Sequence, residues 1–390
     1  MSRVAFFCIP AWGHTNPTVE VVRCLTQQGH QVQYYSFEPF RLKLEAAGAE
    51  VVLCDDYLPP APEDLDDKVG KDFAALIEMI ADTTLALEEM VCERLVAFAP
   101  DVIVSDSVCF WGKLFAKKLG IPYVCSTTTF AFNQHTAKLM KPKGEELLRS
   151  VLGMPRIRRK MKLLRKHGYP VKSFVDLIQN DNETNTIVYT SREFQPMAET
   201  FGDSYAFVGP SLPLNVIRQV EKDRPLIYIS LGTVMHHGKG GLYRNCVEAL
   251  ADLEADVVLS VGTEENLATL GAIPSNVIAR ASVDQLDILS RADVFLTHCG
   301  MNSASEAIWF GVPTVLFPLQ SEESVIAGRM EQLGLGIRLK SERPEEIKRA
   351  VKEALGNAAY RENTVKIGDT FRAAGGASLA AEKIILWSKT

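Results

Sequence analysis

Apolar runs of strand length alternate with longer helical patterns along most of this 390-residue chain. The first series of runs is RVAFFCI, QVQYYSF, AEVVLC, DVIVSD, PYVCSTT and TNTIVYTS, and the second is PLIYISLGT, ADVVLSVG, ADVFLTH, VPTVLFP and LGIRL. Such alternation is typical of parallel strands joined by right-handed crossovers. The sequence therefore predicts an α/β protein with two successive parallel sheets.

The length of the chain favours two domains, because a single hydrophobic core rarely grows beyond roughly 250 residues. A stretch rich in proline and polar residues, FVGPSLPLNVIRQVEKDRP, separates the two series of strands. Ligands of open parallel sheets bind beyond the carboxyl ends of the strands, so two such domains are expected to face each other across a cleft. The predicted parts are an N-terminal domain over 1–214, a linker over 215–224, a C-terminal domain over 225–372 and a terminal helix over 373–390.

Charge and cysteine usage limit the class of function. The net charge of -6 argues against a general nucleic-acid binder, which would normally be basic. The eight cysteines form no regular framework, so we expect no disulfides and a reducing compartment. The first residues contain no apolar run long enough for a signal peptide, and no stretch of about 18 apolar residues occurs elsewhere. These features predict a cytoplasmic protein that acts on a small molecule.

Two polar residues are expected at the same edge of the first sheet. His14 lies near the start of the helix that follows the first strand, where the helix N-terminus disfavours imidazolium and keeps a neutral base available. Asp106 ends the strand DVIVSD and could orient the histidine ring. The alternatives are a histidine bonded only to its own turn and a solvated aspartate.

The segment THCGMNS, residues 297–303, leaves a buried strand and starts a helix. We expect Gly300 to permit the turn and Asn302 or Ser303 to cap the helix, whose backbone N–H groups would bind a phosphate. His298 could donate to the same anion. Glu306 stands three residues after Ser303, so it either completes a capping box or accepts from the hydroxyls of a ribose.

A second glycine turn after a strand, SLGTV, offers Ser230 and Thr233 as phosphate donors. Other motifs fail on inspection. No G-x-G-x-x-G follows a strand, and GTVMHHGKG has the wrong spacing for a P-loop, which disfavours nicotinamide enzymes and nucleotide hydrolysis. Asp64 and Asp66 form a D-x-D in a proline-rich acidic loop rather than at a strand end, which disfavours a metal site.

The segments GHTNPT, PDVIVSD, SLGT and THCGMNSASEAIWFGVPTVLFP resemble, in this order, the UDP-glycosyltransferases of GT-B fold, nearest the bacterial macrolide-type glycosyltransferases. This resemblance implies two Rossmann-like domains and an inverting transfer of a hexose. The implied donor is UDP-glucose, used as a co-substrate without a metal or further cofactor. The implied acceptor is a hydroxyl of an apolar small molecule such as a macrolide, a flavonoid or another phenol.

The resemblance also implies roles for individual residues. His14 would be the general base and Asp106 its carboxylate partner. The implied donor-binding residues are Ser230, Thr233, Val283, Gln285, His298, Gly300, Asn302, Ser303, Glu306, Glu322 and Glu323. The aromatic residues Trp111, Phe130 and Phe132 would line the acceptor pocket, although such residues are equally consistent with the core.

Three positions depart from the family pattern. Ser282 replaces an aromatic residue that stacks on the base, and Asp284 replaces a proline, which leaves Val283 and Gln285 to meet the base edge. Glu323 replaces an amide of the pair that reads the sugar, and a carboxylate accepts hydrogen bonds but cannot donate them. The base and the sugar of the donor are therefore left open.

Residues 156–167, RIRRKMKLLRKH, carry seven Arg or Lys residues at helical spacing from apolar ones. A solvated helix face is the first interpretation, and a contact with a membrane surface or an acidic acceptor is the alternative. We expect no membrane association, and the sequence makes no prediction of oligomeric state. A GT-B-fold nucleotide-sugar epimerase and an inactive nucleotide-sugar binding protein are the competing functions.

Overall fold

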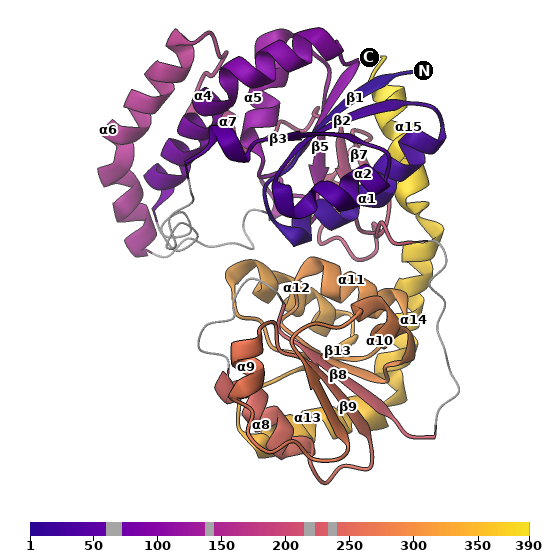
Figure 1. Cartoon of the computed structure of the whole chain (residues 1–390). Helices are drawn as coiled ribbons and strands as arrows, with labels where there is room; N and C mark the ends of the chain where they lie inside the picture. The colour runs from indigo at the N-terminus through magenta and orange to yellow at the C-terminus, as the bar shows by residue number, and fades with distance from the viewer. Residues whose placement is uncertain (60–71, 137–143, 214–222, 233–239, 390) are drawn as a thin grey trace. The chain divides into compact units, whose positions relative to one another are not determined.

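The computed structural model describes residues 1–59, 72–136, 144–213, 223–232 and 240–389 (Figure 1). It forms two compact units. Unit 1 comprises Met1–Tyr189, Met197–Ser211 and Gly375–Thr390, and unit 2 comprises Thr190–Pro196 and Leu212–Ala374. Thr233, Asp64 and Asp66 lie outside the described residues, as does most of the expected linker.

Unit 1 is built on a parallel sheet. Among the described residues it has seven strands in the order β3-β2-β1-β4-β5-β6-β7. The strands are β1 (Arg3–Phe7), β2 (Gln31–Ser36), β3 (Glu50–Leu53), β4 (Val102–Asp106), β5 (Tyr123–Thr127), β6 (Thr186–Val188) and β7 (Tyr205–Phe207). Every pairing between neighbours is parallel. The central strand β1 lies between β2 and β4, so residues that follow β1 and β4 meet at one edge of the sheet.

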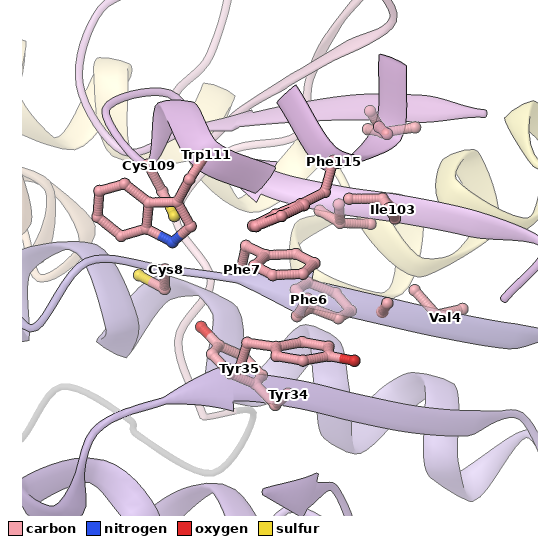
Figure 2. Close-up of a cluster of buried hydrophobic side chains, with 14 of the residues drawn as sticks. Val4, Phe6, Phe7, Cys8, Tyr34, Tyr35, Ile103, Cys109, Trp111 and Phe115 are labelled. Carbon is pink, nitrogen blue, oxygen red and sulfur yellow. The ribbon is translucent and has the colours of Figure 1, made fainter. Parts of the chain in front are cut away.

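The core of unit 1 explains why these strands read as continuous apolar runs. Four of the five residues of β1 are buried, because helices cover both faces of a parallel sheet. The ring of Phe7 stacks on that of Tyr35, with centroids 4.3 Å apart. Phe115 packs on the other side of Phe7 (Figure 2). Burying each such side chain stabilises the fold by about 2 kcal/mol.

Two groups of helices pack on the sheet of unit 1. The helices are α1 (Trp12–Gln27), α2 (Arg41–Ala46), α4 (Phe73–Phe98), α5 (Phe110–Leu119), α6 (Gly144–Lys166), α7 (Phe174–Ile178) and α15 (Gly376–Trp387), with short 3₁₀ turns η1 (Glu38–Phe40), η2 (Asp55–Tyr57) and η4 (Ala198–Thr200). Helix α1 packs against α2 and α15, and α5 packs against α4 and α7. The terminal helix α15 adds Ala380, Ile384 and Trp387 to the core of unit 1.

The basic segment 156–167 lies in α6 up to Lys166, and this helix packs along α4 (Figure 1). Arg156 pairs with Glu78 and, at 2.8 Å, with Asp72, and Lys160 pairs with Asp82. The hydrogen bond from Arg156 is the main cause that lowers the pKa of Glu78. Six of the seven Arg and Lys residues of the segment are exposed, as a solvated helix face predicts. In addition, Arg156 and Lys160 contact carboxylates of α4 that lie 78 residues earlier in the chain. None of the described helices is long and apolar enough to cross a membrane.

Unit 2 contains the second parallel sheet. Within the described residues it has six strands in the order β10-β9-β8-β11-β12-β13. They are β8 (Leu226–Ser230), β9 (Asp256–Ser260), β10 (Val277–Arg280), β11 (Val294–Thr297), β12 (Thr314–Leu316) and β13 (Gly336–Arg338), and all pairings are parallel. The prediction of an α/β protein with two parallel sheets is thus confirmed.

Helices of unit 2 also pack in two groups. They are α8 (Gly240–Leu250), α9 (Glu264–Ala268), α10 (Gln285–Arg291), α11 (Met301–Trp309), α12 (Ser321–Gln332), α13 (Pro344–Gly356) and α14 (Ala358–Ala373). Helix α11 packs against α10, α12 and α14, whereas α8 packs against α13. The segment Thr190–Pro196 belongs to this unit because Arg329 donates to the backbone oxygens of Glu193 and Phe194 at 2.7 and 3.0 Å.

Candidate active site

His14 and Asp106 form a hydrogen bond at the edge of the unit 1 sheet. The distance from His14 Nδ1 to Asp106 Oδ2 is 2.8 Å. The aspartate side chain is 1% exposed and the histidine side chain 26% exposed, so the carboxylate is shielded while the ring remains accessible. Asp106 Oδ1 accepts from the backbone N–H of Val108 at 2.9 Å, which fixes the carboxylate in place. The expected contact between these two residues is confirmed.

The fold brings the pair together because β1 and β4 are neighbours in register. Phe7 pairs with Ser105, the residue before Asp106. The chain leaves β1 and enters α1 at Trp12, where the backbone oxygen of Ala11 accepts from the N–H groups of His14 and Thr15. His14 is therefore the third residue of the helix. With Nδ1–H donated to a carboxylate, the neutral ring carries its basic lone pair on Nε2.

Thr128 is a neighbour of His14 that the sequence analysis missed. Its Oγ1 lies 3.1 Å from His14 Nδ1, and the residue follows β5 directly. β5 is the neighbour of β4 in the sheet, so the position after this strand could have been considered with the others. Thr128 and Asp106 together hold the Nδ1 side of the ring.

The thiols around Asp106 are inert. Burial, followed by the charge of Asp106, raises the pKa of Cys8 and raises that of Cys125 to about 12. Burial is also the main cause that raises the pKa of Cys109. A protonated thiol is a poor nucleophile, so these cysteines do not offer covalent catalysis beside His14. The eight cysteines, all within the described residues, are free.

In unit 2, the turn between β11 and α11 differs from the expectation. The residue with positive φ is Cys299 (φ 70), whereas Gly300 is the N-cap with φ -60. The N–H of Cys299 donates to Thr297 Oγ1 at 3.1 Å, which stabilises this turn. The expected caps were wrong, because the helix begins at Met301 and Asn302 and Ser303 lie inside its first turn with no side-chain cap. Helix N-termini still present backbone N–H groups that attract anions.

His298 explains why glycine occupies two nearby positions. A Cβ atom at Gly300 would lie 2.6 Å from His298 Nε2, and a Cβ atom at Gly232 would lie at the same distance from that atom. Gly232 also has φ +80, which disfavours any other residue. The imidazole of His298 therefore packs directly against the backbone of both turns, one after β8 and one after β11.

The neutral state of His298 leads to a prediction about pH. Burial lowers its pKa from 6.5 to about 4. The unfolded chain takes up this proton near pH 6.5 and the folded chain only near pH 4, so the stability from the neutral ring is complete above pH 6.5 and is lost as the pH falls. At pH 5 the loss is about 2 kcal/mol. We expect the His298 ring signal, assigned by NMR with a His298→Asn variant, to stay constant from pH 8 to 5.5. A midpoint near pH 6.5 would contradict this environment.

Glu306 does not form a capping box. Its Oε2 accepts from Gln285 Nε2 at 2.7 Å, and Gln285 Nε2 also lies 3.3 Å from Ser303 Oγ. Gln285 was expected at the edge of a base, and in the structure it is bonded to Glu306. Tyr228, which the sequence analysis did not single out, donates to Gln285 Oε1 at 3.1 Å. The structure thus brings Gln285, Ser303 and Glu306 together.

The positions that depart from the family pattern have local structural partners. Asp284 is the N-cap of α10 and accepts from the N–H of Asp287, while Ser282 is exposed. Val283 packs at the edge of the cluster around Tyr228. Glu323 Oε2 accepts from the N–H groups of Leu319 and Gln320 at 2.6 and 2.9 Å, so this carboxylate stabilises the start of α12.

The remaining candidates occupy different environments. Glu322 is exposed on the first turn of α12, and Ser230 is buried at the end of β8. Trp111 is 5% exposed and belongs to the unit 1 core, where Figure 2 shows it beside Cys8 and Cys109. Phe130 is also buried, and Phe132 is half-buried. The burial of Trp111 and Phe130 favours the core alternative for these two aromatics.

The described residues of the two units contain no cluster of metal ligands. Among the described residues, no three His, Cys, Asp or Glu side chains form a cluster that could hold an ion. The arrangement that is present consists of a carboxylate-oriented imidazole in unit 1 and a glycine turn with a helix N-terminus in unit 2. Such groups can accept a proton and stabilise an anion.

Comparisons with known proteins agree with this arrangement. Residues 244–382 match the sequence model of a protein family, the erythromycin biosynthesis protein CIII-like C-terminal domain. The chain is 31% identical to the uncharacterized UDP-glucosyltransferase YojK of Bacillus subtilis (strain 168), over 99% of this chain and 97% of that relative. It is also 31% identical to the demethyllactenocin mycarosyltransferase of Streptomyces fradiae, over 98% of this chain and 86% of the relative.

A solved glycosyltransferase structure is also similar to this chain. The calicheamicin glycosyltransferase CalG4 is 28% identical, with a TM-score of 0.80 over 99% of this chain and 98% of that one. The two parallel-sheet units therefore have the GT-B fold. The chain belongs to the GT-B family of UDP-glycosyltransferases, close to the macrolide-type enzymes that glycosylate natural products.

Proposed function

We propose that this glycosyltransferase is an inverting enzyme that transfers glucose from UDP-glucose to a hydroxyl of an apolar small molecule. A macrolide, a flavonoid or another phenol would be a suitable acceptor. The observation that carries the proposal is the 2.8 Å hydrogen bond between His14 and the buried Asp106, because it prepares a neutral imidazole as a base. The eight free cysteines support a reducing cytoplasm as the compartment.

In the proposed reaction, His14 Nε2 takes the proton of the acceptor hydroxyl. The acceptor oxygen attacks the anomeric carbon, and the bond from that carbon to the UDP diphosphate breaks with its electron pair. A single displacement on the opposite side inverts the anomeric configuration. Asp106 stabilises the imidazolium that forms, because the 2.8 Å hydrogen bond becomes an ion pair when the ring gains a proton.

The leaving diphosphate would bind at the N-terminus of α11. Its negative charge is stabilised there by the helix dipole and by donors from His298, Asn302 and Ser303, so the reaction needs neither a metal nor a further cofactor. His298 is neutral at physiological pH and can donate one N–H. Ser230 and Thr233 are proposed as further phosphate contacts on the other glycine turn.

The nucleoside and the sugar would be read by side chains of unit 2. Glu306 would accept from the ribose hydroxyls, and Val283 and Gln285 would meet the base. Glu322 is proposed to bind sugar hydroxyls. One oxygen of Glu323 already accepts hydrogen bonds from backbone N–H groups at the start of α12. The name of one relative, a UDP-glucosyltransferase, supports a UDP-sugar donor, whereas the name of the other, a mycarosyltransferase, states a different sugar and no nucleotide.

A mass-spectrometric screen tests this proposal. UDP- and dTDP-sugars are incubated with a mixed panel of phenols and macrolactones, and products are identified by the added mass of one sugar. We expect a hexose on an acceptor hydroxyl with UDP-glucose, and inversion at the anomeric carbon by proton NMR. An isomerised sugar in the absence of any acceptor would instead identify an epimerase. UDP binding without any product across the panel would favour an inactive binding protein.

A further inference from the structure

A buried tyrosine reaches Glu306 through a single glutamine. Tyr228 lies on β8 and is 1% exposed. Its ring stacks on Phe295 of β11, with centroids 4.7 Å apart and an interplanar angle of 15°. The stack fixes the direction of the phenol, whose hydroxyl donates to Gln285 Oε1 at 3.1 Å.

Gln285 connects Tyr228 to the helix α11 by hydrogen bonds. Its Nε2 donates to Glu306 Oε2 at 2.7 Å and lies 3.3 Å from Ser303 Oγ. An ionised carboxylate only accepts hydrogen bonds, so the amide must turn its nitrogen to Glu306 and its oxygen to Tyr228. The three side chains therefore have one consistent direction of donation, from Tyr228 through Gln285 to Glu306.

The tyrosine remains a donor throughout the physiological pH range. Burial is the main cause that raises the pKa of Tyr228, and the nearby charge of Glu306 adds to it. The phenol therefore stays protonated. If its hydroxyl were absent, the Oε1 atom of Gln285 would lose a partner in a partly buried place, and the amide could rotate away from Glu306.

We infer that Tyr228 is a positioning residue that, through Gln285, orients Glu306 to distinguish a ribose from a 2′-deoxyribose in the donor nucleotide. The inference rests on the proposed function, in which Glu306 meets the ribose. A correctly oriented carboxylate accepts from the 2′-hydroxyl of a ribonucleotide, whereas a deoxyribonucleotide leaves it without this partner. The chain Tyr228–Gln285–Glu306 thus selects UDP-type over dTDP-type donors.

Calorimetric binding of UDP and 2′-deoxy-UDP tests the inference, because these ligands share the base and the diphosphate. We expect wild-type protein to bind UDP at least about tenfold more tightly than 2′-deoxy-UDP. Tyr228→Phe should reduce this ratio to about threefold or less, and Glu306→Ala should bring it to about one. Tyr243→Phe is the matched control, since Tyr243 is equally buried in unit 2 but its hydroxyl donates to the backbone oxygen of Ser260.

The outcomes separate the inference from the proposed function. The ratio compared is the affinity for UDP divided by that for 2′-deoxy-UDP. If Tyr228→Phe keeps the wild-type ratio while Glu306→Ala brings it to about one, only the role of Tyr228 is overturned. A wild-type ratio in Glu306→Ala would remove the ribose contact from the proposed function and the inference with it. A reduced ratio in Tyr243→Phe would show a non-specific effect and also overturn the inference. Should Tyr228→Phe fail to fold, Gln285→Met breaks the same chain and should reduce the ratio equally.

Discussion

Replacing His14 with alanine is expected to lower kcat for glycosyl transfer by about 10³-fold. The variant lacks the base that removes the acceptor proton, whereas the proposed diphosphate site in unit 2 is unchanged. Binding of UDP, measured by calorimetry, should therefore stay within about twofold of wild type. The measurement is kcat with saturating UDP-glucose and an acceptor identified in the product screen.

His30→Ala is the matched control for this variant. His30 is another histidine of unit 1, and its Nδ1 accepts from the backbone N–H of Ser2 before β1, away from the carboxyl ends of the strands. It should retain wild-type kcat. Unchanged turnover in His14→Ala would remove the base from the proposed mechanism, and a loss of UDP binding by that variant would show that its effect is not confined to proton transfer.

Replacing Asp106 with asparagine is expected to lower kcat by about 10²–10⁴-fold without unfolding the protein. The backbone N–H of Val108 donates to Asp106 Oδ1 at 2.9 Å and needs an acceptor there. The side-chain amide of the asparagine variant must therefore keep its oxygen toward Val108 and turn its nitrogen toward His14. His14 Nδ1 would then accept a hydrogen bond, and the ring proton would move to Nε2. The ring would carry the wrong tautomer for a base, although the shape of the site would be almost unchanged.

Asp101→Asn provides the comparison, at the other end of the same strand. Asp101 lies just before β4 and accepts from the backbone N–H of Arg3 at 2.7 Å, at the opposite end of the strand from Asp106. We expect kcat close to wild type for Asp101→Asn. Kinetics of both variants, with thermal unfolding to verify folding, would check the tautomer argument. An active Asp106→Asn enzyme would contradict it.

The sheet and the His14–Asp106 contact could be predicted because both follow from where buried strands begin and end, and each strand is recognisable in a short stretch of sequence. Buried parallel strands read as continuous apolar runs, and the residues that end neighbouring strands meet at one edge. Phe7 and Ser105 are in register, so His14 and Asp106 are brought together although they are 92 residues apart.

The turn before α11 was mispredicted for a physical reason. Positive φ is normally assigned to glycine, yet Cys299 adopts it with the help of Thr297, and Gly300 is required by the space that His298 occupies. Three-residue spacing suggested a capping box at Glu306. The actual partner is Gln285, which is 21 residues away and on another helix. Sequence spacing along one helix cannot reveal such a tertiary contact.

The basic segment of α6 shows the same limit. Its charges predicted a face directed to solvent, and all of its Arg and Lys residues except Lys160 are exposed. The pairing of Arg156 with Glu78 and of Lys160 with Asp82 of α4 was not predicted. Each residue type was visible in the sequence. Their pairing depends on the packing of two long helices, which no local pattern specifies.

The most direct measurement for the proposed donor site is a crystal structure with UDP bound. We predict the diphosphate oxygens at about 2.7–3.2 Å from backbone N–H groups in the first turn of α11, and a ribose hydroxyl within the same range of Glu306. His298 should donate to the same diphosphate. A diphosphate bound elsewhere in unit 2, away from Asn302 and Ser303, would contradict the account.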